Sequence, residues 1–383
     1  MKKFITFIFI IVFIVSFSSS AFANETQKEI LDSIDDKLDG FTSTLPDYII
    51  DFLPNEVLSG DYNAIISEGL DEARLIEYII DYLLLGINKT ITIFSSILVL
   101  LLISSILNTL SASLSNSSLS FAFNLCSSLC VALTVFNVCV SIASYVTQYT
   151  KILCQVMSSF APIMTSILIM SGKISTATIT NATMILLISI TDGFLIACML
   201  PLIKICMMFS CVKSIGGVEF GGLSKLVRNT FTSVTVFIMS LFMFIFSFKN
   251  ILTQGADTVS LKTARFAISS FVPIVGASIN DALRTLASSI SLIKSSCGVL
   301  AILIIALIMI PIIIYIFLNK ISFGLLAGIS RVIKCDNQAS ILEEADSLCS
   351  YMLTLTICTC VLFIFAITIF IKTSSEVGLW TNI

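Results

Sequence analysis

The chain has 383 residues, of which 57% are hydrophobic and only 12% are charged. Soluble domains carry roughly a quarter charged residues, so this composition excludes an ordinary soluble protein and indicates an integral membrane protein. Histidine is absent, which excludes Ser-His triads, histidine-based zinc sites and histidine general bases. With no paired catalytic motif either, the sequence predicts a protein that is not an enzyme.

The net charge of −3 hides an asymmetry along the chain. Residues 24–86 carry fifteen acidic and three basic side chains, whereas the chain from Ile87 onward carries 16 basic and 9 acidic ones. An acidic exported part followed by a basic membrane part is typical of proteins that enter the secretory route.

Residues 1–23 have the pattern of a signal peptide. Lys2 and Lys3 precede an apolar core, and Ala21 and Ala23 form a small-x-small cleavage site. An uncleaved first transmembrane helix is the alternative, and under either interpretation Asn24 is delivered outside the cytoplasm.

Residues 24–86 are predicted to form an acidic, exported helical segment. Ile30, Ile34 and Leu38 mark a first amphipathic helix, Pro46 opens a short second one, and a third runs from Leu70 toward the first membrane span. The segment is too small for a large core of its own, so we expect it to lie on the membrane surface or on a partner. Its acids alternatively form only a solvated face.

Residues 87–371 are predicted to form a polytopic all-α membrane domain, because the apolar runs are long enough to cross roughly 30 Å of hydrocarbon. Residues 372–383 form a tail. The domain contains seven expected spans, and a short additional segment at 321–333 contains Gly324-xxx-Gly328, a pattern that lets helices approach closely. The spans are expected at 87–110, 119–144, 151–171, 177–200, 230–248, 297–318 and 348–371.

The segment 257–294 interrupts the membrane pattern with charged residues. Two amphipathic helices are expected, separated by Pro273 and Gly276, because proline lacks an amide donor and glycine relaxes the backbone. Candidate assembly or polar-path residues here are Asp257, Lys262, Arg265, Pro273, Gly276, Asp281 and Arg284. Arg265 and Arg284 could bind lipid headgroups or an acidic partner, or act as ordinary interfacial anchors. Seven spans would place this segment and the C-terminus in the cytoplasm.

The amino-acid sequence of the same segment resembles that of the stage III sporulation protein AE family of endospore-forming bacteria. The residues and motifs that carry the resemblance are Asp257, Ser260 to Phe266 (SLKTARF), Phe271 to Gly276 (FVPIVG) and Asp281-Ala282. The layout is also similar, with a leader, a short acidic segment and a polytopic domain that runs to the C-terminus.

The resemblance implies a multi-pass protein of the mother-cell membrane around the forespore. It implies partners among the other stage III A-type membrane proteins and the forespore stage II sporulation protein Q. Together these resemble a secretion-like channel apparatus that sustains the engulfed forespore, with the ATPase supplied by a separate protein. A stand-alone secondary transporter is the alternative, because Pro162, Pro201 and Pro311 interrupt spans, as in transporters with broken helices.

Asp192 is the candidate site residue inside an expected span. An intramembrane carboxylate is costly unless it is paired or hydrated. It therefore either lines a polar path or binds a coupling ion, or it lies near the interface at the end of the span.

No cofactor, metal site or nucleic-acid interface is predicted. Gly216-Gly217 and Gly221-Gly222 lack the Gly-Lys-Ser/Thr continuation of a phosphate loop. Cys126-xxx-Cys130 and Cys358-x-Cys360 are spaced like metal or redox pairs, but they lie in apolar runs, where cysteine usually packs as a small hydrophobe.

Overall fold

A computed structural model of the chain describes residues 41, 44–50, 72–113, 117–216, 221–271 and 276–375. Helices account for almost all of these residues, and no strand occurs among them, which confirms the all-α prediction. The elements are α2 (Asp47–Ile50), α5 (Glu72–Ser113), α6 (Ser117–Met170), α7 (Ile174–Ile190), the π-helical turn η1 (Thr191–Ile196), α8 (Ala197–Gly216), α9 (Gly221–Phe271), α10 (Gly276–Val332) and α11 (Asp336–Ser375).

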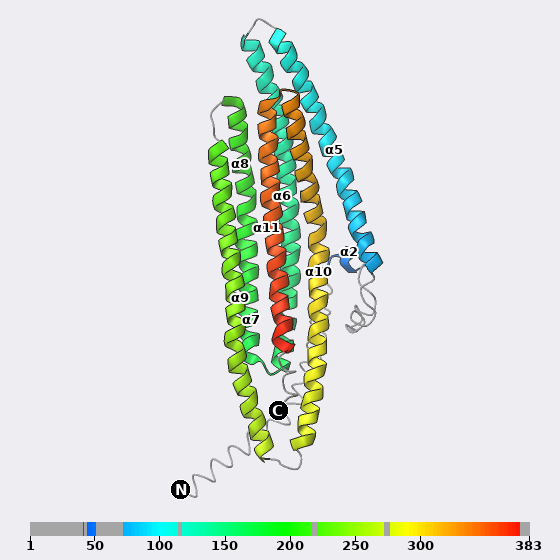
Figure 1. Cartoon of the computed structure of the whole chain (residues 1–383), viewed down its shortest axis with the longest axis vertical. Coiled ribbons are helices and arrows are strands. Elements are labelled where there is room, and N and C mark those ends of the chain that lie inside the picture. Colours follow the sequence, from blue (N-terminus) through cyan, green and yellow to red (C-terminus); the bar gives the residue numbers. More distant parts are fainter. Residues whose placement is uncertain are drawn as a thin grey trace.

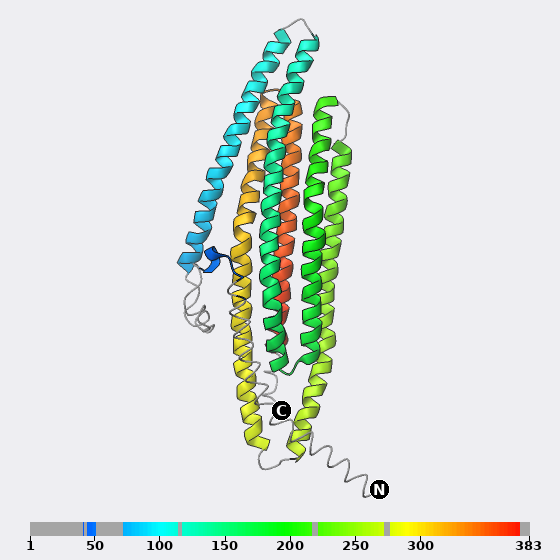
Figure 2. The same ribbon diagram turned by 180° about the vertical axis from the view of Figure 1, so that it is seen from behind.

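The long helices lie side by side along one axis, and successive rods alternate in direction (Figures 1 and 2). The helices α7, η1 and α8 follow one another as a single rod. At the centre, α6 contacts α5, α7, α8, α10 and α11, and α11 contacts α6, α8, α9 and α10. Their apolar faces form one continuous core, so the bundle is organised around these two helices.

The described residues contain six helices long and apolar enough to cross a membrane, which corrects the expected number of seven. The expected spans at 119–144 and 151–171 are parts of the single helix α6. Between them the sequence offers no glycine or proline, and Thr147 and Thr150 donate to the carbonyls of Ala143 and Val146 four residues back. The isolated, exposed Lys151 does not stop a helix, because its long side chain can reach outward from the bundle.

Prolines lie inside helices instead of ending them. Pro162 lies in α6, Pro201 in α8 and Pro311 in α10. The fourth span is expected to end at residue 200, but the rod continues through Pro201 to Gly216. Within an apolar bundle a break would expose several backbone groups, whereas one proline removes a single hydrogen bond that a neighbour can replace.

Pro311 shows how such a replacement works. Proline at this position leaves the carbonyl of Leu307 without its helical amide donor. The hydroxyl of Tyr78 on α5 donates to that carbonyl at 2.8 Å. Close approach of the two helices depends also on Gly86, where a Cβ atom would lie 2.9 Å from Leu318 Cδ1. The contact therefore fixes α5 against the proline site of α10.

The described part of the acidic segment rests on the bundle. Phe41, Leu45 and Ile49 are buried, and the rings of Phe41 and Phe160 lie 5.6 Å apart. Burial raises the pKa of the neighbouring Tyr48 above its usual value. The helix expected from Leu70 continues into the first span as α5, so the boundary expected at residue 87 falls inside one helix. The predicted signal peptide, the first amphipathic helix and residues 376–383 lie outside the described residues.

Six crossings place the start of α5 and the end of α11 on the same side of the membrane, whereas seven would place them on opposite sides. Epitopes inserted before Glu72 and after Lys372 should therefore be labelled from the same side of sealed cells. An epitope in the α10–α11 turn at Lys334 serves as the control and should be labelled from the other side. Opposite labelling of the first two epitopes would contradict the six-span arrangement.

Removing the Tyr78 hydroxyl should destabilise the protein only while Pro311 is present. We expect Tyr78→Phe to lower the free energy of unfolding by about 1–2 kcal/mol, because a buried carbonyl loses its donor. In a Pro311→Ala background the restored amide serves Leu307, and the same change should cost about half as much or less. Unfolding of the four purified proteins in mixed micelles measures this cycle. Equal costs in both backgrounds would contradict the role given to Tyr78.

Candidate functional site

Asp192 lies within the π-helical turn η1, in the middle of the α7–α8 rod. It is roughly 27 Å along the axis from Ile174, and the candidate span continues to Val212. The side chain therefore does not lie at the end of a span. It is exposed on the outside of the bundle, so it does not line an interior path in a single copy. π-Helical turns often occur at functional sites, and Asp192 stays a candidate for contact with another molecule.

The charged segment 257–294 forms the end of a long hairpin. Helix α9 ends at Phe271 and α10 begins at Gly276, where the sequence predicts the break. The two helices extend past the α6–α7 turn and the end of α11 (Figures 1 and 2).

The hairpin brings the candidates of this segment to one end of the molecule, far from Asp192. Asp257, Lys262 and Arg265 lie on α9, and Asp281 and Arg284 lie on α10. Arg265 and Asp281 lie at similar distances from the turn, whereas Pro273 lies outside the described residues. The structure describes the course of the backbone here, and the roles of these side chains stay predictions.

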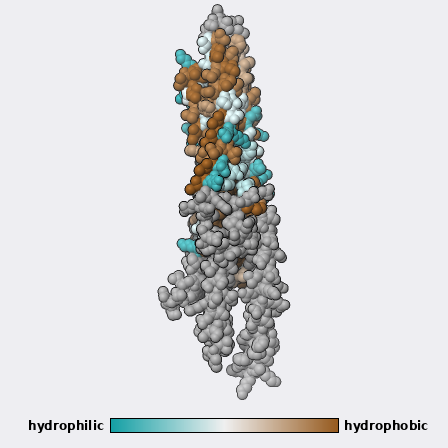
Figure 3. Space-filling view, turned by 90° about the vertical axis from the view of Figure 1, so that its right-hand side faces the viewer, coloured by the Kyte–Doolittle hydropathy of each residue, from teal (hydrophilic) through white to brown (hydrophobic). Residues whose placement is uncertain are grey.

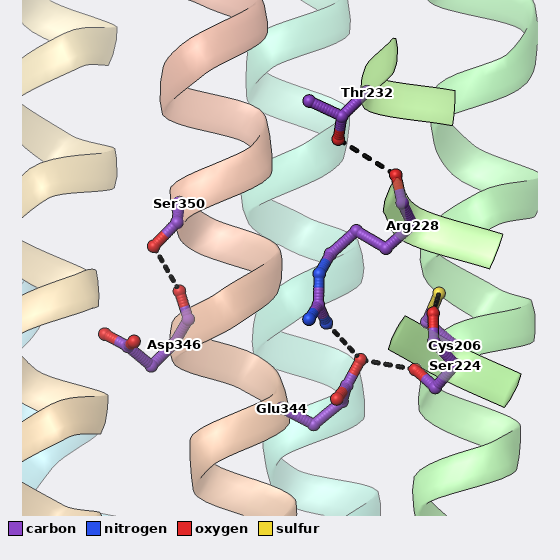
Figure 4. A network of polar contacts seen from close by, with 7 residues as sticks. All are labelled: Cys206, Ser224, Arg228, Thr232, Glu344, Asp346 and Ser350. Atoms are coloured by element: carbon purple, nitrogen blue, oxygen red, sulfur yellow. Dashed lines mark hydrogen bonds and ion pairs between the residues drawn. The ribbon is translucent and has the colours of Figure 1, made fainter. Parts of the chain in front are cut away.

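An ion pair that sequence reasoning missed joins α9 to α11 (Figure 4). The guanidinium of Arg228 donates to Glu344 Oε1 at 2.7 Å, and the Ser224 hydroxyl donates to the same oxygen at 2.5 Å. Only 14% of the Arg228 side chain and 15% of the Glu344 side chain are exposed. Arg228 and Glu344 are 116 positions apart in the sequence, so no local sequence pattern predicts that they pair.

A cleft lies between α10 and α11, and neither Arg228 nor Glu344 lines it. Its volume is about 410 Å³, and it is lined by Gly324, Ala327, Gly328, Arg331, Glu343, Asp346 and Ser347. Arg331 and Glu343 form a second, exposed ion pair. A Cβ atom at Gly324 would lie 3.6 Å from Asp346 Oδ1, an ordinary contact, and one at Gly328 would meet nothing within 4 Å. The Gly-xxx-Gly pattern is therefore not required for the approach of α10 to α11.

Buried polar side chains hold the α10–α11 turn against α5 and α6. Gln338 Nε2 donates to Ser127 Oγ at 2.9 Å, and Ser127 donates to Ser104 at 2.7 Å. Asn108 Nδ2 approaches Cys335 Sγ at 3.6 Å. Burial raises the pKa of the Cys335 thiol, so it is a weak nucleophile and serves the packing of the turn.

Charged residues are sorted along the axis of α9, α10 and α11. Lys320 and Asp346 lie roughly 18 and 15 Å from the α10–α11 turn, and Arg228 is placed near them by its bond to Glu344. Farther from the α10–α11 turn than these residues, three stretches contain no charged side chain: 229–248, 295–319 and 347–371. The last two are each about 37 Å long, enough to cross the hydrocarbon of a bilayer.

We call these three stretches the charge-free band. The ends of α10 and α11 beyond it, from Lys320 to Asp346, form the charged tier. On the opposite flank, the exposed Lys151 and Asp192 lie at the level of the band.

The described residues contain no group of three or more histidine, cysteine, aspartate or glutamate side chains that could hold a metal ion. Cys126 and Cys130 are exposed and Cys358 and Cys360 are partly buried, all as free thiols. The arrangement suits helix association and polar contact at the membrane edge.

Breaking the buried ion pair should cost far more than breaking the exposed one. We expect Glu344→Ala to lower the free energy of unfolding by about 3 kcal/mol, because Arg228 would remain buried without a counter-charge. The matched control Glu343→Ala removes the neighbouring, exposed pair and should cost less than about 1 kcal/mol. Denaturant unfolding of the purified variants measures both changes, and similar costs would refute the structural importance of Glu344.

Comparison with known proteins identifies a family that this chain matches. Residues 63–374 match the family described as stage III sporulation protein AE. A curated relative, stage III sporulation protein AE of Bacillus subtilis (strain 168), is 25% identical over 176 residues. That alignment covers 45% of this chain and 43% of the relative, so the chain spans less than half the length of the relative it matches. No solved structure matches.

The family match covers most of the chain, from the residues before α5 to the end of α11, and it includes the ion pair, the cleft and the protruding hairpin. The resemblance read from the charged segment is thereby confirmed. The chain belongs to the stage III sporulation protein AE family.

Proposed function

We propose that this chain is a non-enzymatic membrane component of a channel or secretion-like complex that links mother cell and forespore after engulfment. The family match over residues 63–374 carries this proposal, because it establishes a sporulation protein with membrane-spanning helices. The proposed location is the mother-cell membrane around the forespore. The proposed partners are the other stage III A-type membrane proteins and stage II sporulation protein Q.

The protruding α9–α10 hairpin supports a role in assembly. It projects past the neighbouring helices (Figure 1), and its basic residues outnumber its acidic ones. A helical hairpin that carries Arg265 and Arg284 suits contact with an acidic partner domain. Arg265 and Arg284 are therefore proposed as assembly residues.

A stand-alone transporter is the second candidate. Broken or distorted helices build binding sites in many transporters, and the π-helical turn η1 with Asp192 is such a distortion. Solute flux through liposomes containing only this chain would favour that function, whereas a dependence on co-purifying proteins would favour the complex.

Charge reversal on the hairpin should separate assembly from insertion. We expect Arg265→Glu combined with Arg284→Glu to lower heat-resistant spore yield at least tenfold while the protein level in the membrane stays unchanged. The same variant should lose the proteins that co-purify with tagged wild-type chain from sporulating cells. Lys372→Glu, at the same end of the bundle, serves as the control and should retain both.

Two results would contradict the proposal. The first is a wild-type chain that purifies from sporulating cells without other membrane proteins. The second is a normal spore yield in a strain that lacks the chain.

A further inference from the structure

Helix α9 carries two cationic side chains, about one helical turn apart, that face different ways. Arg228 pairs with Glu344 of α11, and only 14% of its side chain is exposed. Lys225 is exposed on the outer face of the helix and forms no ion pair with a described residue. The charge of Lys225 can therefore attract an anion from outside the bundle.

Lys225 lies at a shallow hollow on this outer face, which we call the α9 hollow. Its volume is about 510 Å³, and the residues that line it include Lys225, Asn229, Thr230, Ser233 and Val234. The Asn229 amide and the Ser233 hydroxyl are exposed and donate to no other described residue. An ammonium, an amide and a hydroxyl are all donors to phosphate oxygens, and the ammonium gives the stronger, charge-assisted bond.

An apolar stripe begins in the hollow and continues along α9. Val234 is followed by Phe237, Leu241, Phe244 and Phe248 at alternating spacings of three and four, and these side chains are 39% to 68% exposed. We call these five residues the α9 stripe. From Val234 to Phe244 the stripe is roughly 15 Å long, which is half the thickness of the hydrocarbon core and thus the depth of one leaflet.

The hollow and the stripe follow one another in the order that a membrane surface requires. Helix α9 begins at Gly221, about one turn before Lys225, so its apolar surface extends from the lysine in one direction only. The uncharged stretch 229–248 is roughly 30 Å long, the thickness of the hydrocarbon core. Lys225 therefore lies at the level of lipid headgroups, and Phe237 lies at the level of acyl chains.

The opposite flank differs, because it exposes charges at the level of the charge-free band. The Tyr78 hydrogen bond to α10 places the exposed Glu77 and Asp81 of α5 there. Figure 3 looks onto the α5 flank, where hydrophilic side chains lie among the hydrophobic ones. Helix α9 lies across the bundle from α5 (Figure 1), and residues 229–248 carry no charge, so lipid covers the α9 stripe without burying an ion.

We propose that the α9 hollow binds the headgroup of an anionic phospholipid, with the acyl chains along the α9 stripe. Lys225 supplies the attraction for a negatively charged headgroup, and Asn229 and Ser233 donate to the phosphate oxygens. Free phosphate would use the same donors but would gain nothing from Phe237 and Phe244. The inference concerns the contact of this chain with lipid and does not depend on the proposed sporulation complex.

Lipid retained by the purified full chain tests the headgroup site. After reconstitution in equal parts of phosphatidylglycerol and phosphatidylcholine, we expect mass spectra of the intact wild type to show bound phosphatidylglycerol, and Lys225→Gln to retain about fivefold less. The matched control is Lys204→Gln on α8. Lys204 is an exposed lysine at a similar level, because the nearby Cys206 thiol approaches the Ser224 carbonyl at 3.9 Å. The control should retain the wild-type amount.

Two results of this experiment would overturn the site. An equal loss from Lys225→Gln and Lys204→Gln would reduce the effect to overall charge. Displacement of the bound lipid by inorganic phosphate would overturn the assignment to lipid. Circular dichroism should show equal helix content in the wild type and both variants.

Fluorescence quenching in bilayers tests the stripe without detergent. The single tryptophan, Trp380, is replaced by phenylalanine so that Phe237→Trp supplies the only indole. Phosphatidylglycerol brominated on its acyl chains should quench this indole more than brominated phosphatidylcholine at the same content, and Lys225→Gln should abolish the difference. A control indole from Leu102→Trp on α5, where the native side chain is 48% exposed, should show no such difference.

Two quenching results would contradict the proposal. Absence of quenching by either lipid would show that something other than lipid covers the stripe. Equal quenching of the Phe237→Trp indole by both lipids would overturn the selection of an anionic headgroup.

Discussion

The fold depends on the need to satisfy every backbone amide and carbonyl within an apolar bundle, where no water can serve them. Continuous helices meet this need with internal hydrogen bonds, and for that reason α6 runs unbroken from Ser117 to Met170. Where Pro311 removes one donor, the Tyr78 hydroxyl of α5 supplies another. The constraint that keeps the helices intact thereby also decides which helices lie together.

The same low-dielectric environment sorts the charged residues. On α9, α10 and α11 the charges collect at two levels and leave the charge-free band between them. Arg228 and Glu344, at the edge of that band, are largely buried together, and Glu344 also accepts a hydrogen bond from the Ser224 hydroxyl. A buried charge without its partner would be costly, so this pair fixes the register of α9 against α11. The exposed Arg331–Glu343 pair, which uses the adjacent residue of α11, carries no such constraint.

Surface chemistry then differs from flank to flank at one level of the bundle. The α10–α11 flank exposes charged side chains and a cleft, whereas the α5 flank exposes the apolar side chains of Val99, Ile103 and Ile106. The α9–α10 hairpin adds a charged projection at the far end (Figure 2). A membrane protein with three chemically distinct outer surfaces suits a place within an assembly, which agrees with the proposed role of this family member in sporulation.

Two local properties of the sequence, hydropathy and helical period, determine that the chain is an all-α membrane protein. They also predict that the helices of the charged segment separate between Phe271 and Gly276, as they do in the structure. The same local reasoning counted one span too many, because nothing in the sequence around Lys151 states whether a helix continues. Only the tertiary structure decided the pairing of Arg228 with Glu344, the exposed position of Asp192 and the uncovered face of α5. These depend on which helices pack together and in which register, and that choice is made by contacts between residues more than a hundred positions apart.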